Sequence, residues 1–352
     1  MSPGEPRPVL LLTSPDCLRH DPGPVHPERP DRLRAILDAL ERRGLGEALQ
    51  RPEVVPVDRA LLEAVHDPGY LRTVERAVAA GGGPLDPDTV VGPGSLEAAL
   101  AAAGAAVQGA EAVARGDARA AFAAVRPPGH HARPAAAMGF CLFNNAALAA
   151  VAARDRAGAR RILLVDWDVH HGNGTQECFE RDPTVLYVSL HQEGWYPGTG
   201  AWDEVGSGDG EGFTLNVPLP PQTGDEGYAL VFEEVVVPLA RAFAPDLVLL
   251  SAGYDPHHAD PLGGMVMTAG GFRRLATLLL DAAAGSRGVA AVLEGGYALE
   301  ALGVCVVATL EALTGRSADP PIPEERPPEL SYAVIRERVR RARSVALNYW
   351  RI

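Results

Sequence analysis

Residues 162–174 read ILLVDWDVHHGNG, an unbroken aliphatic run that passes directly into aspartate and histidine side chains. The run Ile162–Val165 is typical of a strand that is buried on both faces, as in a parallel sheet. Ligands of open parallel sheets bind beyond the carboxyl ends of the strands. The stretch therefore predicts a buried strand that delivers Asp166, Asp168 and His170 to a site at the edge of the sheet.

Similar aliphatic runs recur along the chain, with room for a helix between them. The predicted strands are Val9–Leu12, Val54–Val57, Ala121–Val125, Ile162–Val165, Val185–Leu190, Thr214–Val217, Leu247–Ser251 and Val289–Leu293. The helical patterns between them are Leu96–Arg115, Phe143–Arg156, Tyr228–Phe243 and Gly271–Ala284. This alternation predicts an α/β fold with a mainly parallel sheet and right-handed crossovers.

The chain predicts a single domain, residues 1–352, because it shows no internal repeat and no convincing linker before about residue 316. We expect the core to cover residues 9–315 and a Pro-rich segment, 316–330, to run over the surface. A final amphipathic helix is predicted over Tyr332–Trp350, within residues 331–352. Its predicted buried positions are Val334, Ile335, Val339, Val345 and Leu347.

Composition and charge argue against several classes of protein. The formal net charge is −13 and the one basic cluster lies near the C-terminus, which argues against a protein that binds nucleic acid through its phosphates. No signal peptide and no run near the roughly 18 apolar residues of a membrane span is found. The four cysteines lie far apart without a CxxC pair, which predicts reduced thiols in a cytoplasmic protein. The lysine-free, Ala- and Arg-rich composition suggests a bacterial gene; a homo-oligomer is left open.

Three other predicted strands also end on residues that can do chemistry. The residues are His130 and His131 after the strand at 121–125, Asp255 after the strand at 247–251, and Tyr297 after the strand at 289–293. Because the carboxyl ends of parallel strands meet at one edge of a sheet, we expect these side chains to gather at a single site.

Asp166, Asp168 and His170 are spaced by two, so a strand that continued this far would place them on one face. With Asp255 they form a set of nitrogen and oxygen ligands suited to Zn²⁺, with a position left for water or substrate, as in a catalytic site. Fe²⁺ would fit the same ligands. A lone DxDxH stretch would equally suit a surface turn; the other strand ends favour the metal site.

Two adjacent imidazoles after a Pro-Pro-Gly turn favour acid–base work by His130 and His131. Tyr297 follows a Gly-Gly pair, which can bring its phenol close to a substrate carbonyl as an oxyanion donor. A tyrosine in a turn is more often a packing residue, and here its neighbours favour the catalytic interpretation.

Six blocks of the sequence resemble the signatures of the zinc-dependent histone deacetylase family. They are His26-Pro-Glu-Arg-Pro-Asp-Arg32, Arg126-Pro-Pro-Gly-His-His131, Gly139-Phe-Cys-Leu-Phe-Asn-Asn145, Asp166-Trp-Asp-Val-His-His-Gly-Asn-Gly-Thr-Gln176, Ser251-Ala-Gly-Tyr-Asp255 and Glu294-Gly-Gly-Tyr297. The resemblance covers residues 9–315 in order, and the family includes bacterial histone-deacetylase-like amidohydrolases, acetylpolyamine amidohydrolases and acetoin-utilisation proteins. It implies the arginase/deacetylase fold, an eight-stranded parallel sheet between helices, and zinc-dependent hydrolysis of an acylated amine, foremost N-acetyl-lysine.

The resemblance also implies a role for each residue of the site. Its metal ligands would be Asp168, His170 and Asp255; His131 would be the general base and then the acid; His130 would act through charge, oriented by Asp166; and Tyr297 would polarise the acetyl carbonyl. Asn173 stands where some members have an aspartate paired with the second histidine, which resembles the class II branch.

The substrate tunnel of this family is walled by two aromatic residues. By resemblance these are Phe140, next to Gly139, and Tyr196, where phenylalanine is usual. Asp88 would be the rim carboxylate that holds a peptide backbone. Leu262 occupies the rim position where polyamine-selective members carry glutamate, which favours an acyl-lysine peptide or protein as substrate. Members also bind K⁺ or Na⁺, and the matching residues are Asp166, Asp168, His170, Ser189 and Leu190.

Three other functions remain open from the sequence. An acetylpolyamine or small-molecule amidohydrolase would use the same site, and the acidic surface suits a cationic substrate. An arginase-type ureohydrolase would need further Asp and His ligands for a second metal ion. A non-catalytic acyl-lysine binding module would not need Tyr297 or the pair His130 and His131.

Overall fold

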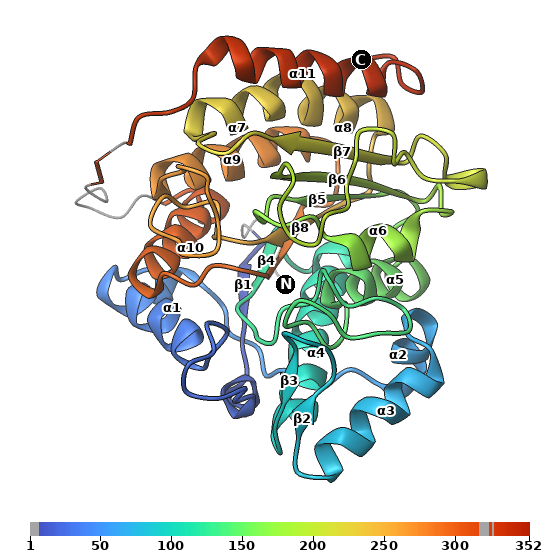
Figure 1. The fold of residues 1–352 in the computed structure, drawn as a ribbon, viewed down its shortest axis with the longest axis vertical. Coiled ribbons are helices and arrows are strands. Elements are labelled where there is room, and N and C mark those ends of the chain that lie inside the picture. The colour runs from blue at the N-terminus through green and yellow to red at the C-terminus, as the bar shows by residue number, and fades with distance from the viewer. Residues whose placement is uncertain (1–6, 317–323, 326) are drawn as a thin grey trace.

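The computed structural model describes residues 7–316, 324–325 and 327–352, and a seven-stranded sheet lies at its centre (Figure 1). The strand order is β1 (Val9–Leu12), β4 (Ala120–Ala123), β9 (Val289–Leu293), β8 (Leu247–Ala252), β5 (Ile162–Asp166), β6 (Val185–Gln192) and β7 (Thr214–Leu219). Each neighbouring pair is parallel. Every residue of these strands is buried, as expected for aliphatic runs covered on both faces.

Helices cover both faces of the sheet (Figure 1). The helices are α1 (Asp31–Arg42), α2 (Arg59–Val65), α3 (Pro68–Ala79), α4 (Ser95–Arg115), α5 (Asn145–Ala157), α6 (Asn173–Phe179), α7 (Asp225–Val231), α8 (Val237–Phe243), α9 (Ala269–Ala282), α10 (Leu299–Thr314) and α11 (Tyr332–Ala346). A short ribbon pairs β2 (Gly83–Pro84) with β3 (Val90–Val91). Helices α4 and α5 pack together on one face, α9 and α10 on the other, and α11 lies against the edge strand β7. The predicted α/β fold is confirmed.

One predicted strand is wrong, so the sheet has seven strands where eight were expected. Residues Val54–Val57 are extended, but they lie along helix α4: the amide of Val55 donates to Gln108 Oε1, and that of Val57 donates to the carbonyl of Leu100. Pro56 between them has no N–H to donate to a sheet. A Cβ on Gly104 would lie 2.1 Å from the carbonyl oxygen of Val55, so this contact needs glycine.

The C-terminal helix begins at Tyr332 as predicted but ends at Ala346 rather than at Trp350, and part of its predicted buried face is wrong. Ile335 and Val339 are buried, whereas Val334 and Leu347 are 40% and 51% exposed. Ala342 and Ala346 complete the buried stripe. From Ile335 through Val339 to these two alanines the steps are four, three and four residues, so all four side chains share one helix face. The two exposed residues lie beside that face. Most of the Pro-rich segment, residues 317–323 and 326, lies outside the described residues. Among the described helices, none is long and apolar enough to cross a bilayer.

Candidate active site

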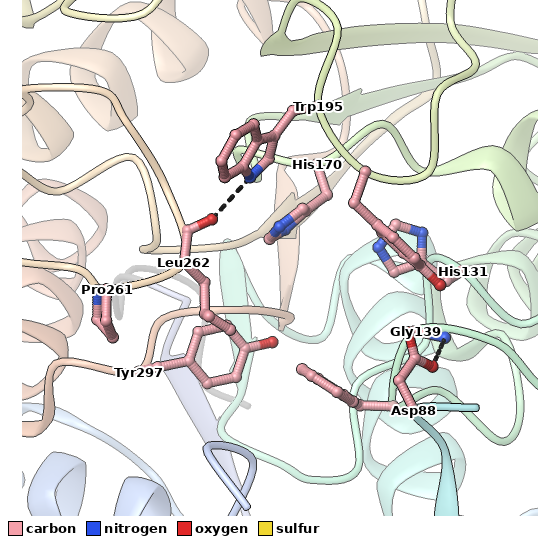
Figure 2. Close-up of a pocket in the computed structure, with 10 residues that line it drawn as sticks. Asp88, His131, Gly139, His170, Trp195, Pro261, Leu262 and Tyr297 are labelled. Atoms are coloured by element: carbon pink, nitrogen blue, oxygen red, sulfur yellow. Dashed lines mark hydrogen bonds between the residues drawn. The ribbon is translucent and has the colours of Figure 1, made fainter. Parts of the chain in front are cut away.

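A cavity of about 260 Å³ opens at the carboxyl edge of the sheet (Figure 2). It is lined by Asp88, His131, Gly139, Phe140, His170, Trp195, Tyr196, Pro261, Leu262 and Tyr297. The loops after β4, β5, β6, β8 and β9 all contribute, which is where a parallel sheet places its ligands. The cavity is lined by all five residues expected to contact substrate. Trp195 and Pro261 also line the cavity and were not predicted from the sequence. Trp195 donates from Nε1 to the carbonyl of Leu262 at 2.8 Å, and this hydrogen bond joins two loops at the rim of the cavity.

Asp168, His170 and Asp255 come together at this cavity, with their ligand atoms within 4.8 Å of one another. His170 Nδ1 is 3.0 Å from Asp168 Oδ1 and 3.2 Å from Asp255 Oδ2. Asp255 Oδ2 is buried and, despite its closeness to His170 Nδ1, accepts no well-directed hydrogen bond in the described part of the chain. Burial, reinforced by the charge of Asp168, raises the pKa of Asp255 to about 7. Two buried carboxylates beside an imidazole, with one carboxylate oxygen lacking a well-directed hydrogen bond, fit a bound divalent metal cation.

Two glycines make room for these carboxylates. A Cβ on Gly253 would lie 2.0 Å from Asp168 Oδ2, and a Cβ on Gly295 would lie 2.0 Å from Asp255 Oδ2. Only glycine lets the backbone after β8 and β9 approach this closely, which explains its place in both sequence blocks.

Strand β5 ends at Asp166, and residues 168–170 form a bend. The strand does not continue to His170, so Asp166, Asp168 and His170 do not lie on one strand face. Asp166 is not part of the group formed by the other two: its Oδ2 accepts from the Tyr187 hydroxyl at 3.0 Å and lies 3.1 Å from His130 Nδ1, and its Oδ1 accepts from the amide of Asp168.

The two adjacent histidines occupy opposite electrostatic environments. Burial opposes charge on His130, but Asp168 and Asp166 outweigh it and raise its pKa to about 10. Burial, followed by the neighbouring His130 and His170, lowers the pKa of His131 well below 6.5. His131 Nδ1 lies 2.8 Å from Asn173 Oδ1. Neighbouring groups whose pKa values are driven apart are suited to different roles, a fixed cation and a neutral base.

Tyr297 reaches the cavity from the loop after β9. Its backbone amide donates to Asp260 Oδ2 at 2.5 Å, and its ring stands edge-on to Phe140, with centroids 5.8 Å apart. Burial raises the pKa of its phenol well above 10, so the hydroxyl stays protonated and can donate. In Figure 2, His131, His170 and Tyr297 point into the same cavity.

The walls are held by an unusual turn. Gly139 and Phe140 both have positive φ, and a Cβ on Gly139 would lie 2.3 Å from His131 Cδ2. Asp88 Oδ1 accepts from the amide of Gly139 at 3.0 Å. The ring of Tyr196 stands edge-on to His131, with centroids 5.1 Å apart. Phe140 and Tyr196 thus reach the cavity as the two expected aromatic side chains.

Residues 26–313 match the family model for the histone deacetylase domain. The chain belongs to the histone deacetylase family. This membership places it among enzymes that hydrolyse amide bonds. Of the 352 residues, the match leaves out only the ends of the chain, including the C-terminal helix α11.

Relatives of this deacetylase-family chain come from plants, archaea and bacteria. It is 42% identical over 311 residues to histone deacetylase 15 of Arabidopsis thaliana, covering 87% of this chain and 56% of that protein. It is 40% identical to a probable deacetylase of Archaeoglobus fulgidus (81% and 80% covered) and 41% identical to a histone deacetylase-like amidohydrolase of Pseudomonas aeruginosa (83% and 78%). The crystal structure of the HDA15 HD domain superposes with a TM-score of 0.90 at 39% identity, over 98% of this chain and 95% of that chain.

A buried ionic network lies behind the site, and it was not predicted from the sequence. Arg32 donates to the carbonyls of Gly296 and Glu294, and its guanidinium lies 4.8 Å from the ring centroid of Tyr297. Glu28 pairs with both Arg32 and Arg126, and all three side chains are fully buried. Charged residues usually indicate surface, and no sequence pattern marks a buried pair; the only signal was their place in two of the resembling blocks.

Replacing Glu28 by glutamine is expected to destabilise the fold by about 3–5 kcal/mol, because two buried guanidinium groups lose their counter-charge. Burial alone would raise the pKa of Glu28, but Arg126 lowers it to about 2. A carboxylate with a lowered pKa stabilises the fold fully above its ordinary pKa, and we expect that contribution to fade as the pH falls from about 4.5 to 2. Urea unfolding across this range should show a steeper acid loss for the wild type than for Glu28→Gln; parallel curves would contradict the network's role.

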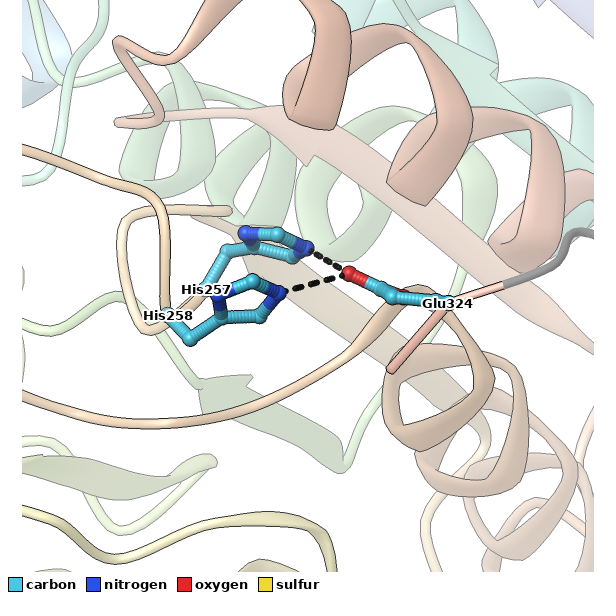
Figure 3. A group of neighbouring side chains, drawn as sticks. All are labelled: His257, His258 and Glu324. Carbon is cyan, nitrogen blue, oxygen red and sulfur yellow. Dashed lines mark hydrogen bonds and ion pairs between the residues drawn. The ribbon is translucent and has the colours of Figure 1, made fainter. Parts of the chain in front are cut away.

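A second group of histidine and glutamate side chains lies outside the cavity (Figure 3). The Nε2 atoms of His257 and His258 lie 2.5 and 3.0 Å from Glu324 Oε1. Glu324 Oε2 also accepts from the amide of Ala269 at the start of α9. His257 Nδ1 accepts from the amide of Ala259, so its Nε2 carries the proton and points at Glu324. The group therefore ties the C-terminal segment to the core through hydrogen bonds.

Proposed function

We propose that the protein removes the acyl group from N-acetyl-lysine in a zinc-dependent hydrolysis. One observation carries the proposal: the cavity brings His131 and Tyr297 together with the group Asp168, His170 and Asp255. A base, a phenol donor and a cation-fitting set of ligands at one end of an aromatic-walled cavity are the parts that amide hydrolysis requires.

The metal would be held by Asp168, His170 and Asp255. When bound, zinc supplies Lewis acidity to the carbonyl and makes water more acidic. Fe²⁺ would suit the same three ligands. Asp255 Oδ2 supports this assignment, because it makes no well-directed hydrogen bond and its close neighbour His170 Nδ1 is itself a proposed ligand; a bound cation would engage both atoms.

The protein's own residues would move the protons. Nδ1 of His131 is engaged by Asn173, which leaves Nε2 free to accept a proton from water as its oxygen attacks the acyl carbon. Tyr297 donates to the carbonyl oxygen as negative charge develops there. His131 then returns the proton to the nitrogen as the C–N bond breaks, which yields acetate and a free amine. His130 would keep a positive charge beside Asp166, because Asp168 and Asp166 raise its pKa against the effect of burial.

The rim supports an acyl-lysine peptide or protein as the substrate. Phe140 and Tyr196 would flank the aliphatic stem of the lysine, and Asp88 would hold the peptide backbone at the rim. Leu262 leaves its side of the rim uncharged. The net charge of −13 keeps an acetylated polyamine as the second candidate, because an acidic protein attracts cations.

We also propose a K⁺ or Na⁺ site beside the catalytic residues, formed by Asp166, Asp168, His170, Ser189 and Leu190. The pairing of Asp166 with Ser189 across β5 and β6 supports it, since this register brings neighbouring carbonyls to the same strand ends. A cytoplasmic, bacterial setting is proposed from the four free cysteines and the composition.

The test is amine release by the zinc-loaded enzyme from acetyl-lysine peptides, longer acyl-lysines and acetylated polyamines. The chain contains no lysine, so an amine-reactive dye reads the product with little background from the enzyme. Turnover of the peptides is expected. Faster turnover of acetylated polyamines would favour the second candidate substrate. The absence of amine release from every substrate would overturn the proposed function.

Replacing Asn173 by aspartate is expected to move the acid limb of the pH–rate profile to higher pH. The pKa of His131 is lowered by burial and by its histidine neighbours, and a carboxylate at 2.8 Å would raise it again. A base must be unprotonated, so a raised pKa requires a higher pH for full activity. Steady-state kinetics from pH 5 to 9 would measure the shift; an unmoved acid limb would contradict it.

A further inference from the structure

A second cavity, of about 520 Å³, borders Asn173, the hydrogen-bond partner of His131. Met138 lines it as well, and it shares no lining residue with the substrate cavity. Asn173 Nδ2 donates to Met138 Sδ at 3.4 Å, while its Oδ1 lies 2.8 Å from His131 Nδ1. The amide of Asn173 thus bridges a thioether and the imidazole that the proposed reaction uses as its base.

The two ends of this amide are not equivalent. Oδ1 only accepts and Nδ2 only donates. With Oδ1 toward His131, Nδ1 carries the proton and Nε2 has a free lone pair. If the amide rotated by half a turn, Nδ2 would donate to Nδ1, the proton would move to Nε2, and the ring could no longer accept a proton there. The orientation of Asn173 therefore decides which tautomer His131 adopts.

We propose that Met138 is a positioning residue that selects this orientation, because its sulfur accepts a hydrogen bond and offers none. The inference rests on the proposed role of His131 as the base. With sulfur opposite Asn173, the rotated amide would set one acceptor against another, while the observed amide satisfies both contacts.

The backbone around Met138 is built to keep the sulfur in place. Met138 and Cys141 exchange two backbone hydrogen bonds, of 3.3 and 2.9 Å. Between them, Gly139 packs directly against His131 and Phe140 forms a cavity wall. One four-residue turn thus carries both a wall of the substrate cavity and the acceptor for Asn173.

Three variants separate this role from simple packing. Met138→Leu keeps the volume but removes the acceptor, and kcat is expected to fall by about 2- to 10-fold, the range that corresponds to one ordinary hydrogen bond, with KM unchanged. Met138→Lys places a donor opposite Asn173 and should favour the rotated amide. Its kcat is expected to fall on the order of 100-fold or more, since a wrong imidazole tautomer costs up to about 10⁴-fold in a serine protease. Met267→Leu, a buried methionine away from this contact, is the matched control and should keep its kcat.

The same changes in an Asn173→Asp background give the decisive comparison. Both oxygens of aspartate accept hydrogen bonds, so the side chain has no orientation to select. There, Met138→Leu is expected to leave kcat unchanged from the single Asn173→Asp variant, and the penalty of Met138→Lys should shrink by at least 10-fold. Equal losses in the two backgrounds would indicate a packing role and overturn the proposal.

A readout without turnover keeps this test independent of the proposed activity. Nitrogen-15 NMR of the metal-free protein distinguishes protonated from unprotonated ring nitrogens of His131. The proposal expects the proton on Nδ1 in the wild type and on Nε2 in Met138→Lys. The same tautomer in both proteins would overturn it, even if acetyl-lysine is turned over; the expected change would support it, even if the substrate assignment fails.

Discussion

Asp255→Asn is expected to abolish both metal binding and amide hydrolysis while leaving the metal-free fold as stable as the wild type or more stable. Asp255 is fully buried, and among the described residues its Oδ2 accepts no well-directed hydrogen bond, although His170 Nδ1 lies 3.2 Å away. In the metal-free protein, burial and the charge of Asp168 together outweigh the attraction of His170 and raise the pKa of Asp255, so a neutral amide relieves both effects. The loss of zinc affinity should exceed the roughly 10- to 100-fold that a residue behind the ligands typically costs.

The measurement combines zinc content with thermal unfolding. A ligand that binds only the folded state stabilises it by about 2.7 kcal/mol at one hundred times its dissociation constant. Zinc should therefore raise the Tm of the wild type and leave the Tm of Asp255→Asn unchanged. An exposed carboxylate change, Asp155→Asn, is the control and should keep the zinc effect. Equal zinc stabilisation of Asp255→Asn and wild type would remove Asp255 from the ligand set.

Tyr297→Phe is expected to lower kcat by about 10²–10³-fold with little change in KM, the usual cost of removing one donor to a developing oxyanion. The ring would keep its edge contact with Phe140 and its place against Arg32, so the fold should be unaffected. Because burial keeps the phenol protonated, the loss should hold across the neutral pH range.

Tyr196→Phe provides the matched control for that prediction. It removes the same hydroxyl group from the other side of the cavity, where it lies near Asp88 at the rim. We expect a change in kcat of less than about 10-fold, since a hydroxyl outside the reacting atoms contributes at most one ordinary hydrogen bond. Comparable losses in both variants would remove the special role of Tyr297. Single-turnover kinetics with an acetyl-lysine peptide would separate chemistry from product release.

The sheet was predictable because its strands are continuous aliphatic runs, and few other structures bury every side chain of a short segment. The aliphatic run Val54–Val57 gives the same signal but is not a strand: it lies on α4 with Val57 buried and Val55 63% exposed, and only the partners of its amides distinguish it from a strand. The buried stripe of α11 was partly wrong because alanine completes it, and alanine gives a weak hydrophobic signal.

Sequence alone determined that the strands are buried and parallel and that His130, His131, Asp255 and Tyr297 follow their carboxyl ends, since these properties depend on local pattern and chain order. The tertiary structure decided what each side chain meets there. It ended β5 at Asp166 and turned that carboxylate toward His130, brought Asp255 Oδ2 beside His170, and placed Met138 against Asn173. These contacts join residues far apart in the chain, so they depend on how the loops pack over the sheet, which no local pattern in the sequence encodes.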